Sequence, residues 1–142
     1  MNFKKRPLGI WIITAFYFYS VYIVLRSYWL INMGLIPMNE VQRSYLASVS
    51  ATNWFIPIIS GILTLAAAVS LFLLRRISLM LFVISFGLSL FATLFEALTT
   101  NWVKAIASTG NGGGLIGVAV GWMIQISILL YINNLIKKKI LK

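Results

Sequence analysis

The sequence predicts an all-α membrane protein with four transmembrane helices in an up-down bundle and a short amphipathic helix in the first outer loop. Hydrophobic residues make up 61% of the 142 residues, and charged residues make up 10%. A soluble domain is about half apolar and about a quarter charged, so these charges are too few to cover a soluble surface. Disorder requires the opposite composition. We therefore expect one integral membrane domain over residues 1–142.

Four continuous apolar runs predict the membrane-spanning helices. A hydrocarbon core about 30 Å thick requires roughly 20 consecutive apolar residues per helix. The runs that meet this requirement cover about residues 8–28, 54–74, 77–98 and 114–133. Strands of a membrane barrel would alternate over short segments, and these runs do not. The first run also resembles a signal peptide, but it is longer and lacks a small-residue cleavage motif, so we expect an uncleaved span.

The distribution of Lys and Arg predicts the orientation. With four spans, nine of the 12 basic residues fall on one side of the membrane and three on the other. Because Lys and Arg are enriched in cytoplasmic loops, we expect a multi-pass protein with both termini in the cytoplasm. The same bias accounts for the net charge of +10, so no nucleic-acid partner is expected. The nine residues are Lys4, Lys5, Arg6, Arg75, Arg76, Lys137, Lys138, Lys139 and Lys142, and the three are Arg26, Arg43 and Lys104.

The loop between the first two spans carries its own helical signal. Asn39 is a good N-cap, and Gln42 three residues later makes a loose capping box. Val41, Tyr45 and Leu46 then share one face. This pattern predicts a short helix on the outer membrane surface or over the bundle. It serves either as an ordinary amphipathic linker or as a substrate lid.

The sequence lacks the side chains that most enzymes use. It contains no Cys, His or Asp, and its two acids are Glu40 and Glu96. Without His, the commonest general base near neutral pH is missing. Without Cys, neither a thiolate nucleophile nor a thiolate metal site can form. We therefore expect no catalytic, cofactor-binding or metal-binding residues, and a protein that is not an enzyme.

Glu96 is the one acid inside a predicted span. An ionisable side chain there costs roughly 3 kcal/mol on insertion scales and faces the bundle or a partner. Glu96 lies near the outer end of its span, and Arg26 at the outer end of the first span is expected at a similar depth. We therefore predict an intramembrane ion pair between Glu96 and Arg26, with Lys104 as a second candidate partner. The functional alternative is a carboxylate that couples transport to protons or cations.

Small and polar residues form stripes in the last two spans. In membranes, helices associate through small residues and a few hydrogen bonds. The third span carries one stripe and the fourth carries glycines at every fourth position, so we expect these two helices to pack closely. The alternative is a polar path for a solute. The packing stripes are Ser85, Ser89 and Thr93 in the third span, and Gly113, Gly117, Gly121 and Gln125 in the fourth.

The first residues of the chain resemble those of other small membrane proteins. The segment Lys5-Arg6-Pro7-Leu8-Gly9-Ile10-Trp11 runs straight into the first span and resembles the start of small four-span bacterial inner-membrane proteins of unknown function. This resemblance implies a bacterial or archaeal plasma membrane and supplies no activity. Small multidrug transporters also have four spans, but they carry an essential glutamate in the first helix, where this chain has no acid.

These observations lead to one expected role and one alternative. The expected role is a non-enzymatic accessory or structural subunit of the membrane. Its expected partners are the lipid bilayer and another membrane protein, or a second copy in a homo-oligomer. The alternative is a small-solute or ion transporter or channel that works as an oligomer, with Glu96 in the path.

Overall fold

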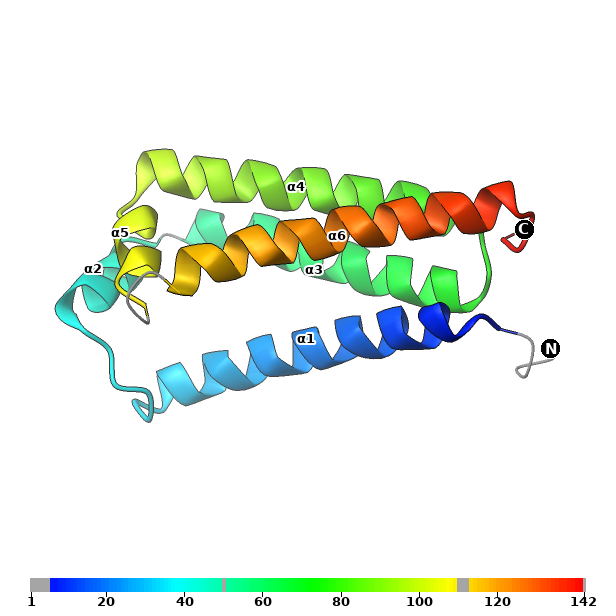
Figure 1. Cartoon of the computed structure of the whole chain (residues 1–142). Coiled ribbons are helices and arrows are strands. Elements are labelled where there is room, and N and C mark those ends of the chain that lie inside the picture. The colour runs from blue at the N-terminus through cyan, green and yellow to red at the C-terminus, as the bar shows by residue number, and fades with distance from the viewer. Residues whose placement is uncertain (1–5, 50, 110–112, 142) are drawn as a thin grey trace.

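The chain folds into helices alone over the part that the structure describes. The computed structural model describes residues 6–49, 51–109 and 113–141, and these contain no strand. The all-helical prediction is therefore confirmed. The helices are α1 (Leu8–Asn32), α2 (Glu40–Ser48), α3 (Ala51–Phe72), α4 (Ile77–Thr99), α5 (Trp102–Ala107) and α6 (Gly113–Lys137) (Figure 1).

Four of these helices are long and apolar enough to cross a membrane, as the hydropathy predicted. The qualifying segments are Leu8–Ile31, Phe55–Phe72, Ile77–Thr99 and Gly113–Lys137. Several helices extend beyond the apolar runs, and α3 begins at Ala51 rather than near residue 54. The first ends at Asn32 rather than near residue 28, and the last ends at Lys137 rather than near 133. A helix continues past its apolar run because its end is set by backbone hydrogen bonds and caps as well as by hydropathy.

Helices α3 and α4 form the closest pair of the bundle. The chain leaves α3 through Leu74, whose φ of 57° is left-handed. The Leu74 amide donates to the Leu71 carbonyl at 2.9 Å, and the Arg75 amide donates to the Ser70 carbonyl at 2.9 Å. This pattern is a Schellman motif, which ends a helix abruptly. The two helices therefore turn back on each other within a few residues.

The core lies at the end of the molecule that carries both termini (Figure 1). There the first turns of α1 meet the last turns of α3 and α6. The Arg6 guanidinium lies 3.9 Å from the centroid of the Phe72 ring, and Trp11 meets the same ring edge-on at 4.9 Å. The buried cluster consists of Ile10, Ile13, Tyr17, Ala67, Ala68, Leu71, Phe82, Ile128, Ile132, Leu135 and Leu141.

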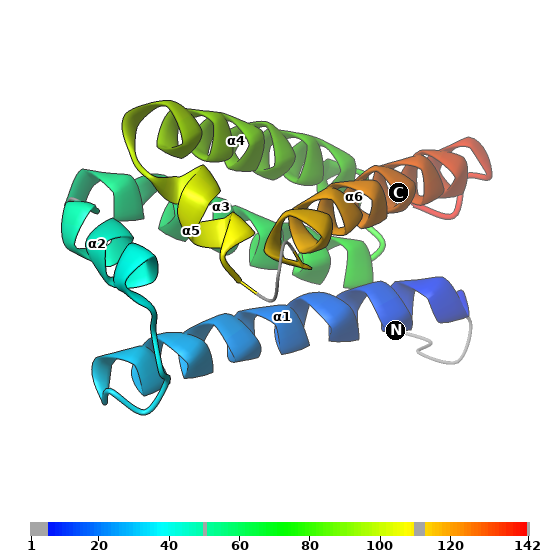
Figure 2. The ribbon, with the colours of Figure 1, turned by 60° about the vertical axis from the view of Figure 1, so that its left-hand side comes forward.

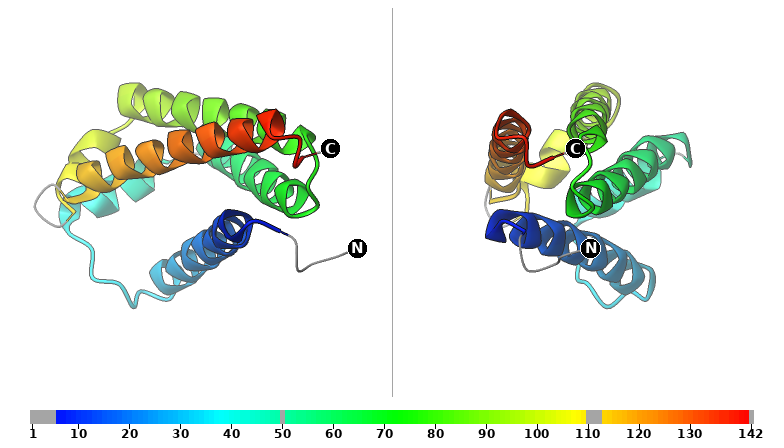
Figure 3. Two further views of the ribbon diagram at one scale, coloured as in Figure 1. Left: turned by 45° about the vertical axis from the view of Figure 1, so that its right-hand side comes forward. Right: turned by 90° about the vertical axis from the view of Figure 1, so that its right-hand side faces the viewer.

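Helix α1 leaves the bundle as it runs away from this core. Its buried hydrophobic residues, Ile10, Ile13 and Tyr17, all lie in its first ten residues. Farther along, Tyr19, Tyr22 and other large side chains are exposed. Figures 1 and 3 show the start of α1 close to the other helices and its far end standing apart. After Tyr17, no described side chain of α1 is buried, so the outer half of this helix is the less packed half.

Two short helices lie together at the opposite end of the molecule (Figure 2). Asn39 caps α2: its side chain accepts from the Gln42 amide at 2.8 Å, and its own amide donates to the Gln42 side chain at 3.1 Å. The Asn39 side chain donates to Ser108 at 3.2 Å, and the Gln42 side chain donates to Thr109 at 3.1 Å. These bonds tie the start of α2 to the end of α5. Helix α5 itself was not predicted from the sequence.

Candidate functional site

Glu96 joins α4 to α2 through a hydrogen bond. It lies in the last turn of α4 and is half-buried. The Tyr45 hydroxyl donates to its carboxylate at 3.1 Å. Tyr45 reaches α4 because the capping box at Asn39 starts α2 beside α5. Glu96 is thus an attachment point for α2.

The structure does not bring Arg26 to Glu96. Arg26 is exposed on the outer half of α1, which stands away from α4 (Figure 3). Lys104 lies in α5 and is also exposed. Among the described residues, Glu96 forms no ion pair, and its hydrogen-bond partner is Tyr45. The physical reason is the course of α1, whose described buried residues all lie near its start.

The glycine stripe of α6 does not meet another helix. A Cβ added at Gly113, Gly117 or Gly121 would find no atom within 4 Å. Helix α6 instead joins the core nearer its end, through Ile128, Ile132 and Leu135.

Two other glycines do make close approaches. A Cβ at Gly9 would collide with the Tyr131 ring, and one at Gly114 would collide with the Ile106 carbonyl. The first contact brings the start of α1 against α6, and the second brings the start of α6 against α5. Sequence spacing alone gave no signal for either contact, because each partner comes from a different helix.

A cavity of about 330 Å³ nevertheless brings several of the predicted stripe residues together. It lies among α1, α4 and α6. Ser89 and Thr93 line it from α4, and Gly121 and Gln125 line it from α6. Ser85 does not line it, because that side chain is fully buried and donates to the Phe82 carbonyl. The remaining lining residues are Phe16, Tyr17, Val118, Trp122 and Ile124.

Several polar groups at this cavity have no partner within the described part of the chain. Thr93 uses its hydroxyl to donate to the Ser89 carbonyl at 2.9 Å. In contrast, the Tyr17 hydroxyl, the Ser89 hydroxyl and the Gln125 amide make no hydrogen bond to any described residue. These groups keep accessible surface at the cavity, and a polar group that faces lipid there without a partner is costly. The cavity can therefore bind a molecule that accepts and donates hydrogen bonds.

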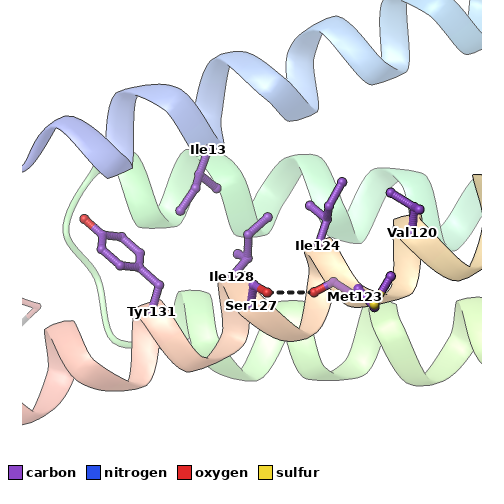
Figure 4. Close-up of a pocket in the computed structure, with 7 residues that line it drawn as sticks. All are labelled: Ile13, Val120, Met123, Ile124, Ser127, Ile128 and Tyr131. Atoms are coloured by element: carbon purple, nitrogen blue, oxygen red, sulfur yellow. Dashed lines mark hydrogen bonds between the residues drawn. The ribbon is translucent and has the colours of Figure 1, made fainter.

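A second cavity, of about 410 Å³, opens between α1 and α6 (Figure 4). Its walls are mainly apolar, and the one Ser hydroxyl, that of Ser127, donates to the Met123 carbonyl at 2.8 Å. Ile124 lines both cavities, so they adjoin at this side chain. The full lining is Ile13, Val120, Met123, Ile124, Ser127, Ile128 and Tyr131.

Three features of the structure bear on function. They are the hydrogen bond from Tyr45 to Glu96, the cavity among α1, α4 and α6, here called the polar cavity, and the apolar cavity between α1 and α6. Comparison with known proteins places no further residue in a role: no family model, no curated protein and no solved structure matches this chain.

Proposed function

We propose that this chain is a multi-pass protein of a bacterial or archaeal plasma membrane, crossing it as an up-down bundle with both termini in the cytoplasm. The end that carries the termini also carries Arg6, the Arg75–Arg76 pair and residues 137–139 (Figure 1). No acid of the chain lies at that end, since Glu40 and Glu96 belong to the other one. A strongly basic end favours the cytoplasmic side and its anionic lipids.

At the other end, α2 is proposed to lie as an amphipathic helix on the outer surface. Its exposed residues include Glu40, Arg43 and Ser44, whereas Tyr45 and Leu46 are half-buried. The Tyr45 bond to Glu96 turns Tyr45 toward the bundle, whereas Val41, expected on the same face, is 39% exposed. This arrangement suits an amphipathic helix that has one face in water and Tyr45 and Leu46 against the protein.

The role that we propose is that of a non-enzymatic accessory or structural subunit. The observation that supports it is the outer half of α1, where Tyr19, Tyr22 and Arg26 are all exposed. These residues are separated by three and four positions and so share one helix face. Polar side chains within a membrane are costly unless they pair with a neighbour. A helix of another membrane protein would supply both the missing packing and the polar partners.

The test is the native mass of the tagged protein after gentle extraction from its own host. We expect a stoichiometric foreign subunit to copurify. The triple variant Tyr19→Ala, Tyr22→Ala, Arg26→Ala is expected to lose that subunit, because it removes the polar face of α1. Met80→Ala is the matched control, since Met80 is 64% exposed on α4; it is expected to keep the subunit. A chain that purifies alone, or a triple variant that keeps its partner, contradicts the proposed role.

The alternative role, an oligomeric transporter or channel with Glu96 in the path, has less support. The Glu96 carboxylate accepts from Tyr45, and Glu96 lines neither cavity. A carboxylate that couples transport more often lies near the middle of the membrane. A homo-oligomer without any foreign subunit in the same preparation would favour this alternative.

A further inference from the structure

The cavity among α1, α4 and α6 has features that a subunit role does not require. We propose that it is a binding site for an uncharged ring compound that carries hydrogen-bond acceptors, such as a quinone. The site is separate from the outer face of α1, so this proposal and the proposed role can fail independently. Its volume of about 330 Å³ lies at the small end of ligand sites, which run from about 300 to 1,000 Å³.

The walls of the cavity suit a flat ring. Phe16, Tyr17 and Trp122 contribute three aromatic side chains from two helices. Aromatic rings gain energy from stacked or edge-on contact with another ring. Gly121 leaves the space open, because no atom lies within 4 Å of the position that its Cβ would take.

The polar groups of the cavity call for hydrogen-bonding atoms on the ligand. The Tyr17 hydroxyl has no hydrogen-bond partner within the described ranges and is accessible from the cavity. The same holds for the Ser89 hydroxyl and the Gln125 amide. These groups come from α1, α4 and α6, so the donors surround the cavity. A ring with carbonyl oxygens would satisfy several of them, whereas a hydrocarbon would leave all of them unpaired.

The absence of charge in the lining selects a neutral ligand. None of the nine lining residues is Lys, Arg or Glu. The nearest acid along α4, Glu96, is bound to Tyr45 of α2. An ionised ligand would lose its hydration in this site without gaining a counter-charge. The site therefore excludes carboxylates and ammonium compounds of the same size.

The adjoining apolar cavity gives a path from the bilayer. It lies between α1 and α6 and meets the polar cavity at Ile124. Figure 4 shows Tyr131 at one end of this cavity, where the Tyr131 ring lies close against Gly9. A lipophilic ring compound dissolved in the membrane would enter sideways between the two helices.

The experiment uses the purified full chain in lipid nanodiscs and follows tryptophan fluorescence, because Trp122 lines the cavity. Three probes of similar shape are titrated: methylnaphthoquinone, methylnaphthalene and naphthoate. We expect saturable quenching by the quinone, weaker binding of the hydrocarbon and none of the carboxylate. The chain contains no Cys, so the quinone cannot add to a thiol. Equal binding of quinone and hydrocarbon, or no saturable binding of any probe, overturns the proposal.

Two glycine variants locate the binding. Gly121→Leu fills the cavity and is expected to abolish quinone binding. Gly117→Leu is the matched control, because Gly117 lies one turn away, has equally open surroundings and does not line the cavity. It is expected to bind as the unchanged protein does. If both variants bind equally, the quinone partitions into lipid or binds elsewhere, and the site is refuted.

A third variant tests the hydrogen bonds without depending on the glycines. Gln125→Leu removes one polar group and is expected to weaken quinone binding about tenfold, the typical cost of a lost buried hydrogen bond. Binding of methylnaphthalene is expected to stay the same or improve. An unchanged affinity for the quinone would show that Gln125 does not contact it and would contradict the proposed mode.

Discussion

The hydrogen-bond partner of Glu96 is a neutral tyrosine hydroxyl rather than a charged side chain, and this lowers the cost of burying the carboxylate. Burying an ion pair requires both charges to lose their hydration. A tyrosine hydroxyl stabilises the carboxylate while bringing only a small polar group out of water. Because Tyr45 belongs to α2 and Glu96 to α4, the bond also fixes the short helix to the end of a long one.

A double-mutant cycle tests this bond. Tyr45→Phe and Glu96→Leu are each expected to destabilise the detergent-solubilised protein, and the double variant is expected to cost less than their sum by about 1 kcal/mol. Thermal unfolding measures all three. Arg26→Gln combined with Glu96→Leu serves as the comparison and is expected to be additive, since Arg26 is exposed on another helix. Additive losses for Tyr45 and Glu96 would contradict the assignment.

At this scale the sequence predicts local contacts and misses distant ones. Asn39 and Gln42 form the capping box that their spacing of three residues indicated. The partner of Glu96 lies 51 residues away along the chain. No spacing rule identifies such a partner, because it depends on where α2 settles after the long helices have packed. Charge and expected depth suggested Arg26, but the outer half of α1, which carries Arg26, stands away from α4.

At the scale of the helices, glycine has different roles at different places. Gly114 starts α6 directly against the Ile106 carbonyl of α5, with no room for a Cβ. Gly117, three residues later, has open surroundings and is exposed. The first glycine permits a close approach of two backbones, as glycine uniquely can. Gly117 makes no such close approach in the folded chain.

This contrast gives a stability prediction. Gly114→Ala is expected to destabilise the protein by about 1–3 kcal/mol, as overpacking against a fixed neighbour does. Gly117→Ala is expected to be neutral or to stabilise by up to about 1 kcal/mol, because Ala favours a helix interior more than Gly does. Thermal unfolding in detergent compares the two. If Gly117→Ala destabilises as much as Gly114→Ala, the stripe packs against another helix after all.

The long helices were predictable and the short α5 was not. Hydropathy identifies the spans because each needs about 20 apolar residues in a row. Helix α5 has six residues, Trp102–Ala107, which is too short for a periodic pattern to stand out. The residues just after it accept bonds from Asn39 and Gln42 at the start of α2, and Gly114 approaches it closely. These contacts exist only in the folded chain.

At the scale of the whole molecule, the two ends differ in packing and in charge. The end with both termini holds the buried core and six described Lys and Arg residues without an acid. The other end holds α2, α5, both glutamates and the free half of α1. The distribution of Lys and Arg predicts which loops lie on the cytoplasmic side of the membrane. The uneven packing could not be predicted, because hydropathy does not distinguish a lipid-facing from a helix-facing apolar residue.

The most direct test of this account is the topology of single-cysteine variants, which is unambiguous because the chain has no Cys of its own. Ser44→Cys on α2 and Lys138→Cys after α6 both replace exposed residues. Intact cells are treated with a membrane-impermeant maleimide. The proposed topology predicts labelling at position 44 in intact cells and labelling at position 138 only after the membrane is opened. Labelling at position 138 in intact cells, or protection at position 44, would contradict it.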